Sequence, residues 1–188
     1  MASNLALTGM IVALINAAFP GIPIPALMLF ACLCGLALGA FNGVLIFQIA
    51  TQLAGGRTGR IAGIVAAVLF VGFPSALNWY GQIHKDGYAI SGLLLVIWSW
   101  IWMRERPVSV KAGAVLLAST VIGAGFVAFF RPYNLIPLAA VMVVLLGFLA
   151  ALDSRDLSRR WRKLLLYFVS AALLAASAVW VKGLGIDE

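Results

Sequence analysis

Polar and ionisable side chains gather in one short stretch of an otherwise apolar sequence. Asn78, Gln82 and Lys85 follow one another at helical spacing, which places them on one side of a helix. His84 and Asp86 flank the lysine. Amide and ammonium groups both donate hydrogen bonds, so a stripe of them suits an anionic head group such as a lipid phosphate. We predict that Asn78, Gln82, His84 and Lys85 bind such a group, with Asp86 holding Lys85 in place.

The same residues also have a purely structural interpretation. Asp86 in the first turn of a helix complements the positive end of the helix dipole. Lys85 can extend its amine to the membrane surface while its stem stays among apolar groups. His84 is consistent with a structural role as well as with a pH-sensitive one. The residue pattern alone leaves both interpretations open.

Arg131 is the second candidate for phosphate binding. It lies between the end of a long apolar segment and Pro132, a residue that suits the first turn of a new helix. A guanidinium group binds phosphate with two parallel hydrogen bonds, which an ammonium group cannot do. We predict that Arg131 and Lys85 converge on one phosphate, the alternative being that Arg131 only anchors a helix end.

Composition determines which elements position these residues. The chain has 188 residues, of which 64% are hydrophobic and 10% are charged. A soluble domain is about 45–50% apolar and about 25% charged, so an ordinary soluble enzyme is excluded. Two cysteines are too few for a disulfide-stabilised secreted domain. The sequence therefore predicts an all-α, polytopic bundle of transmembrane helices.

We identify about seven hydrophobic segments that are candidates for crossing a bilayer, each followed by a polar, glycine or proline break. A span takes about 20 apolar residues, and the first and third segments are short by this measure. The segments comprise residues 4–19, 26–52, 60–73, 86–103, 108–130, 132–152 and 164–182.

The basic residues predict how the bundle is oriented. Ten of the 13 fall in alternate connections, if the connection at 53–60 is cytoplasmic: Arg57, Arg60, Arg104, Arg106, Lys111, Arg155, Arg159, Arg160, Arg162 and Lys163. The positive-inside rule then places the N-terminus in the cytoplasm and Lys85 and Arg131 on the extracytoplasmic side. The net charge of +7 is thus explained by topology, and we predict no binding to nucleic acid.

Other motifs point to packing. Gly35, Gly39 and Gly43 form a small-residue stripe that suits close helix contact, either inside the chain or in a homo-oligomer. Cys32 and Cys34 point to different faces of a helix, and the chain has one histidine, so we predict no metal site. Nucleotide-binding fingerprints are also missing from the sequence, and we predict no cofactor.

The middle of the chain resembles the polytopic GT-C glycosyltransferases, which use polyprenyl-phosphate-linked sugars. The resemblance rests on residues 45–63, a helix end and short Gly-Arg loop, on Phe-Pro-Ser at 73–75, and on 78–86. It implies a hexosyl- or pentosyltransferase of the bacterial inner membrane that acts on the extracytoplasmic side. It also implies that Lys85 and Arg131 hold the lipid phosphate of the donor.

The resemblance has one departure. The family carries its catalytic carboxylate in the first outer loop, but the corresponding residues 20–25 contain no acid. Either Asp86 is the catalytic base, or residues 1–188 are part of a longer GT-C-like transmembrane domain, or the protein is not a catalyst. The alternative function is a non-catalytic transporter, flippase or accessory subunit of the membrane.

Overall fold

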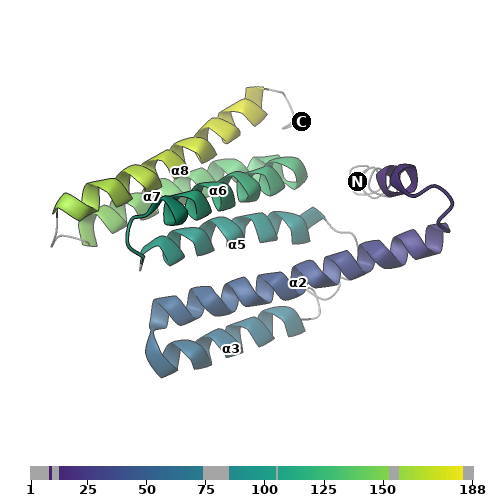
Figure 1. Cartoon of the computed structure of the whole chain (residues 1–188), viewed down its shortest axis with the longest axis horizontal. Coiled ribbons are helices and arrows are strands. Elements are labelled where there is room, and N and C mark those ends of the chain that lie inside the picture. Colours follow the sequence, from purple (N-terminus) through teal and green to yellow (C-terminus); the bar gives the residue numbers. More distant parts are fainter. Residues whose placement is uncertain (1–8, 10–12, 74–84, 105, 153–156, 184–188) are drawn as a thin grey trace.

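The structure, a computed structural model, describes residues 9, 13–73, 85–104, 106–152 and 157–183, without the side chains at 24, 85, 147–152 and 157–160. Helix makes up 92% of these residues, and no strand occurs among them. The elements are α2 Ile24–Ala54, α3 Gly56–Gly72, α5 Lys85–Arg104, α6 Val110–Phe130, the 3-10 helix η1 Pro132–Asn134, α7 Leu135–Leu152 and α8 Leu157–Gly183 (Figure 1).

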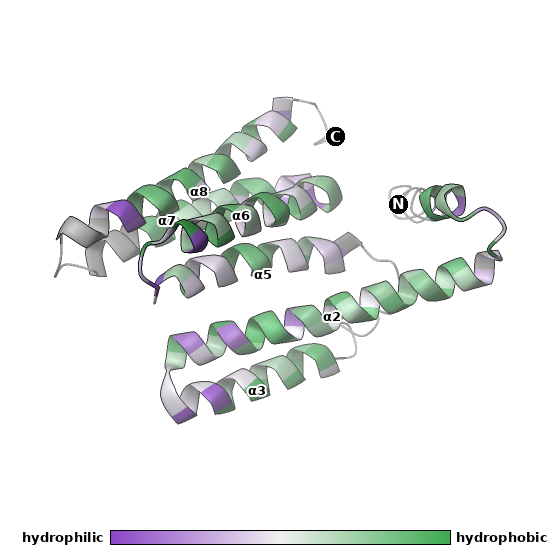
Figure 2. Cartoon of the chain, viewed as in Figure 1, coloured by the Kyte–Doolittle hydropathy of each residue, from purple (hydrophilic) through white to green (hydrophobic). Residues whose placement is uncertain are grey.

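Among the described residues, four helices are long and apolar enough to cross a membrane. They correspond to Pro25–Ala54, Asp86–Arg104, Val110–Phe130 and Trp161–Gly183. The prediction of an all-helical membrane protein is confirmed at this level, and Figure 2 shows the apolar residues along these helices. The count of seven spans is not confirmed, because α3 and the apolar stretch Pro132–Leu146 are shorter and half of the predicted segment 4–19 lies outside the described residues.

One predicted connection is helical instead. The basic run from Arg159 to Lys163 was expected in a solvated loop, but α8 begins at Leu157 and includes it. Arginine and lysine are good helix formers, and a helix can extend past the hydrocarbon layer where its residues are charged. The result is a helix of 27 residues whose first turns are basic.

Local sequence explains where the helices end. Gly55 and Gly56 adopt positive φ values of 68° and 52°, which allows the tight reversal between α2 and α3. The hydroxyl of Ser109 accepts a hydrogen bond from the Ala112 amide at 3.1 Å and so caps the start of α6. Pro132 stops α6 and opens η1.

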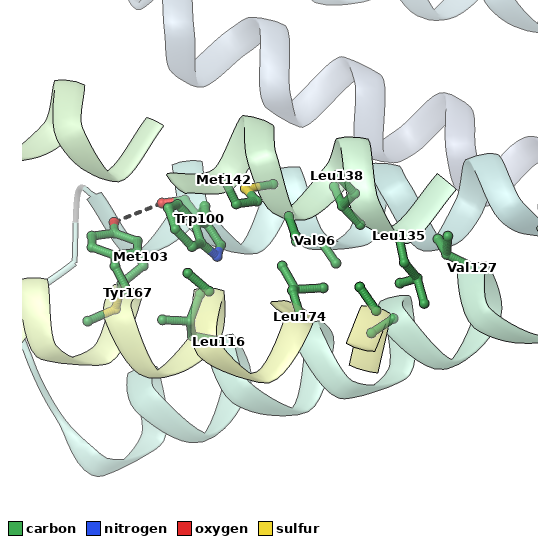
Figure 3. Close-up of a cluster of buried hydrophobic side chains, with 14 of the residues drawn as sticks. Val96, Trp100, Met103, Leu116, Val127, Leu135, Leu138, Met142, Tyr167 and Leu174 are labelled. Carbon is green, nitrogen blue, oxygen red and sulfur yellow. Dashed lines mark hydrogen bonds between the residues drawn. The ribbon is translucent and has the colours of Figure 1, made fainter. Parts of the chain in front are cut away.

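The apolar core lies among α5, α6, α7 and α8 (Figure 3). Val96, Leu116 and Leu174 are among its fully buried members. A polar chain crosses this core, because the indole of Trp100 donates to the Ser170 hydroxyl at 2.8 Å. That hydroxyl also lies 2.7 Å from the hydroxyl of Thr120. Three helices are thereby tied together by side chains that have no water to bind in a membrane.

Two glycines bring α5 and α6 into backbone contact. Gly92 and Gly123 face each other so closely that a Cβ on either one would lie within about 2.6 Å of the carbonyl oxygen of the other. The contact resembles the small-residue interfaces of membrane helices, where backbones approach because no side chain separates them. Neither glycine was predicted from the sequence as a point of helix contact.

The α2–α3 hairpin lies beside α5. The Asn42 amide donates to the buried Ser91 hydroxyl at 2.8 Å, which links α2 to α5. The predicted packing stripe, Gly35, Gly39 and Gly43, is buried within the chain, and a Cβ at Gly43 would lie 2.8 Å from the Val71 side chain. The stripe therefore serves internal packing, at Gly43 against α3, while a homo-oligomer through it stays a prediction.

The charged residues separate toward the two ends of the bundle. Figure 1 places the end of α2, the start of α3, the α5–α6 connection and the start of α8 at one end, which we call the arginine-rich end. The start of α5, the end of α6, η1 and the end of α8 lie at the opposite end, which we call the Asp86 end. This separation agrees with the predicted alternation of connections between two sides.

Candidate functional site

The site at the Asp86 end is built on the meeting of α5 and α6. Asp86 lies in the first turn of α5, which is the dipole position expected for it. Arg131 follows the last residue of α6 with a backbone that is no longer helical, at φ −147° and ψ 69°. Its backbone amide still donates to Val127 at 2.8 Å, so the residue is fixed to the helix end while its side chain turns away.

Arg131 and Asp86 form an ion pair. The Nε of Arg131 donates to Oδ1 of Asp86 across the two helices. The side chains are 21% and 28% exposed, respectively, so the pair is neither sealed in the core nor free in solvent. Hydrogen bonding to Asp86 raises the pKa of the Arg131 guanidinium, which therefore stays charged at physiological pH.

Tyr133 completes the support of the guanidinium group. Nη1 of Arg131 donates to the phenol oxygen of Tyr133, and the guanidinium carbon lies 5.5 Å from the centre of that ring. A guanidinium has five N–H donors, and these two hydrogen bonds use two of them. The others can bind the oxygens of a phosphate without breaking the support.

Aromatic rings line the neighbouring surface of α5 and α6. Tyr88 stacks on Phe130 with ring centres 4.6 Å apart, and Phe129 meets Phe130 edge-on at 5.0 Å. Phe126 extends the row one turn further along α6. These rings pack α5 against α6 in the turns next to Asp86 and Arg131.

The structure places only part of the predicted site. Asp86 and Arg131 are brought together, as the prediction of a shared site at this end requires. Lys85 begins α5 beside Asp86, but its side chain is not described, so its contact with a phosphate stays a prediction. Asn78, Gln82 and His84 lie outside the described residues.

Tyr133 is the residue that sequence reasoning missed. It lies two positions after Arg131, and a tyrosine next to an interfacial arginine was the available signal. Asp86 was predicted to hold Lys85 in place. In the structure its carboxylate contacts Arg131. In the described part of the chain, no three His, Cys, Asp or Glu side chains group closely enough to hold a metal ion.

We expect the Asp86–Arg131 pair to show coupling in a double-mutant cycle of Asp86→Ala and Arg131→Ala. Because the side chains are about a quarter exposed, coupling of about 0.5–1 kcal/mol is expected, near the top of the range for exposed pairs. Reversible unfolding in mixed lipid–detergent micelles measures it. The folded-state pKa of Arg131 is raised, so its contribution is present below that pKa and is lost only in strong alkali.

The matched control for this cycle is Tyr133→Phe, which removes the phenol oxygen and keeps the ring under the guanidinium. It should weaken the hold on Arg131 without changing the charge of the site. Additive single-mutant effects, with no coupling between positions 86 and 131, would contradict the ion pair.

Comparisons with known proteins do not assign the chain to a family. No protein family, curated protein or solved structure matches it.

Proposed function

We propose that the protein is a GT-C-type membrane glycosyltransferase that uses a polyprenyl-phosphate-linked sugar at the Asp86 end. The observation that carries the proposal is the guanidinium of Arg131, held by Asp86 and Tyr133 with N–H donors to spare. An arginine fixed in this way is prepared to bind a phosphate, since little side-chain freedom is lost on binding. The resemblance of residues 45–86 to the family supplies the reaction.

A hollow between α6 and α8 supports a lipid as the carrier of the phosphate. Between α6 and α8 lies a cavity of about 250 Å³, lined mostly by apolar side chains, that reaches Ala128, three residues before Arg131. Small residues such as Ala124 and Gly125 form its wall on α6, and Trp180 borders it on α8. A hydrocarbon chain in this hollow would bring its head group toward the guanidinium.

In the proposed reaction, a hydroxyl of the acceptor attacks the anomeric carbon of the donor sugar. The bond from that carbon to the phosphate oxygen breaks, and the lipid phosphate leaves with the electron pair. Asp86 would take the proton of the hydroxyl, while Arg131 and Lys85 would stabilise the charge on the leaving phosphate. Asn78, Gln82 and His84 would bind the donor on the extracytoplasmic side of the bacterial inner membrane.

The second candidate function is binding of the same lipid without chemistry, as in a flippase, transporter or accessory subunit. The ion pair itself favours it. Asp86 is the one acidic residue in the described ranges, and it contacts Arg131. A carboxylate that holds a guanidinium in place does not need to take part in proton transfer, so Asp86 would then serve to position Arg131.

Lipid binding and sugar transfer are tested in that order. We expect polyprenyl phosphate to bind the protein in nanodiscs saturably, and Lys85→Ala/Arg131→Ala to weaken binding at least tenfold, about 1.4 kcal/mol. Lys182→Ala is the matched control, because it removes an exposed cation at the same end. Equal binding by all three proteins would overturn the lipid-phosphate site.

Transfer then separates the two functions. If the protein is a transferase, Asp86→Asn should keep lipid binding within a few-fold and abolish transfer of a radiolabelled sugar to an acceptor. If wild-type protein binds the lipid and produces no transfer with a panel of nucleotide-free lipid-linked sugars, the non-catalytic function is supported instead.

A further inference from the structure

We propose that the arginine-rich end carries a specific site for the head group of an anionic phospholipid. The site lies where the end of α5 meets the start of α8, on the opposite side of the bundle from Arg131. It is therefore independent of the proposed transferase function.

The first observation is the distribution of charge. Along the sequence, ten of the 13 basic residues and three acids, Glu105, Asp153 and Asp156, fall in the segments that the predicted topology assigns to this side, and their surplus equals the +7 of the whole chain. The other three basic residues, Lys85, Arg131 and Lys182, equal the remaining acids in number. Figure 2 shows hydrophilic residues at the corresponding ends of α3, α6 and α8.

The second observation is a fixed contact between α5 and α8. The amine of Lys163 donates to the carbonyl oxygen of Arg104 at 3.0 Å, at the last residue of α5. Further along the same pair of helices, the hydroxyl of Tyr167 donates to the carbonyl of Trp100 at 2.9 Å. Lys163 is thereby held against the end of α5, which brings this part of α8 next to the start of the α5–α6 connection.

The third observation is that two arginines form cation–π contacts with tryptophan rings. The guanidinium carbon of Arg106 lies 5.2 Å from the ring centre of Trp102, and that of Arg162 lies 5.6 Å from Trp161. A guanidinium stacked on a ring keeps its N–H groups directed outward in its own plane, where they can bind phosphate oxygens. Both arginines are exposed.

These features select a lipid head group as the occupant. Helices long enough to cross the bilayer place their ends at the level of the head groups, where tryptophan is also favoured. Basic residues at that level attract anionic lipids by about 1 kcal/mol each, and basic pockets between helices bind phosphate head groups. We therefore expect the phosphate of an anionic lipid such as phosphatidylglycerol to bind this surface.

The test is native mass spectrometry of protein released from nanodiscs that contain phosphatidylcholine and phosphatidylglycerol. We expect retained lipid to be enriched in phosphatidylglycerol over its share in the nanodisc. Arg106→Gln/Arg162→Gln should reduce this enrichment about tenfold, and Arg106→Lys/Arg162→Lys should keep most of it. The matched control is Arg57→Gln/Arg60→Gln, which removes two exposed cations of α3 at the same end.

The control defines the result that would overturn the proposal. An equal loss in the α3 variant would mean that overall surface charge attracts the lipid and that no site exists between α5 and α8. Absence of enrichment in the wild type would overturn it as well. Circular dichroism of each variant shows that the helices are retained, so a loss of enrichment cannot come from unfolding.

Discussion

Replacing Gly123 by leucine is expected to separate α5 from α6 and to cost about 3 kcal/mol or more of unfolding free energy. A Cβ at this position would lie 2.6 Å from both the carbonyl oxygen of Gly92 and the Cγ2 of Val96. The oxygen belongs to backbone and cannot move aside without shifting α5. Overpacking of a core by a few atoms costs typically about 1–3 kcal/mol. Replacement of glycine by leucine adds four heavy atoms.

Gly125 offers a matched control on the same helix. A Cβ there meets nothing within 4 Å, so Gly125→Leu adds the same atoms where space exists. Reversible unfolding in mixed lipid–detergent micelles, followed by circular dichroism, compares the two variants. Gly123→Ala provides a smaller step with an expected cost of about 1–3 kcal/mol. Equal stability of the Gly123→Leu and Gly125→Leu proteins would contradict the close packing of α5 on α6.

Removal of the Trp100 side chain is expected to have the second large effect. Trp100 is 2% exposed and lies at the centre of the contact among α5, α6 and α8. Its ring meets that of Tyr167 at 4.8 Å, and its indole N–H binds Ser170. Trp100→Ala leaves a cavity as well as a buried hydroxyl pair without its donor. We expect a loss of about 3–5 kcal/mol, measured by the same unfolding assay.

Trp100→Phe separates packing from hydrogen bonding. Phenylalanine keeps an aromatic ring beside Tyr167 but removes the N–H that reaches Ser170 and part of the indole volume. It should still lose less than Trp100→Ala, because most of the buried ring remains. Ser170→Ala removes the same hydrogen bond from α8 without changing the indole, and since hydrogen bonds between membrane helices contribute about 0.6 kcal/mol on average, it should lose the least. A loss for Trp100→Phe as large as that for Trp100→Ala would contradict packing as the main contribution of this side chain.

The amino-acid sequence predicts the helical segments of this protein well, since bilayer thickness sets their length and lipid excludes other backbone structures. The predicted segments at 86–103 and 108–130 differ from α5 and α6 by at most two residues at each end. The start of α8 was predicted too late in the sequence. Charged residues mark where a helix leaves the hydrocarbon layer, but the helix itself can continue beyond that point.

Contacts between helices were harder to predict than the helices themselves. Glycines are visible in the sequences of both α5 and α6. Whether Gly92 and Gly123 form the point of contact depends on how each helix is rotated about its own axis. The pairing of Asp86 with Arg131, 45 residues apart, depends on the same rotation. A single sequence contains no signal for this rotation, so the sequence prediction paired Asp86 with Lys85 and did not include its contact with Arg131.

The length of α2 makes the protein sensitive to the thickness of its membrane. At 1.5 Å per residue, its 31 residues extend roughly 46 Å, whereas a hydrocarbon layer is about 30 Å thick. The 20 and 21 residues of α5 and α6 match that layer without adjustment. In a thinner bilayer, α2 is expected to tilt further while the four-helix core stays upright. The Asn42–Ser91 hydrogen bond would be the point about which α2 tilts. Hydrophobic mismatch would therefore change the orientation of α2 more than that of the other helices.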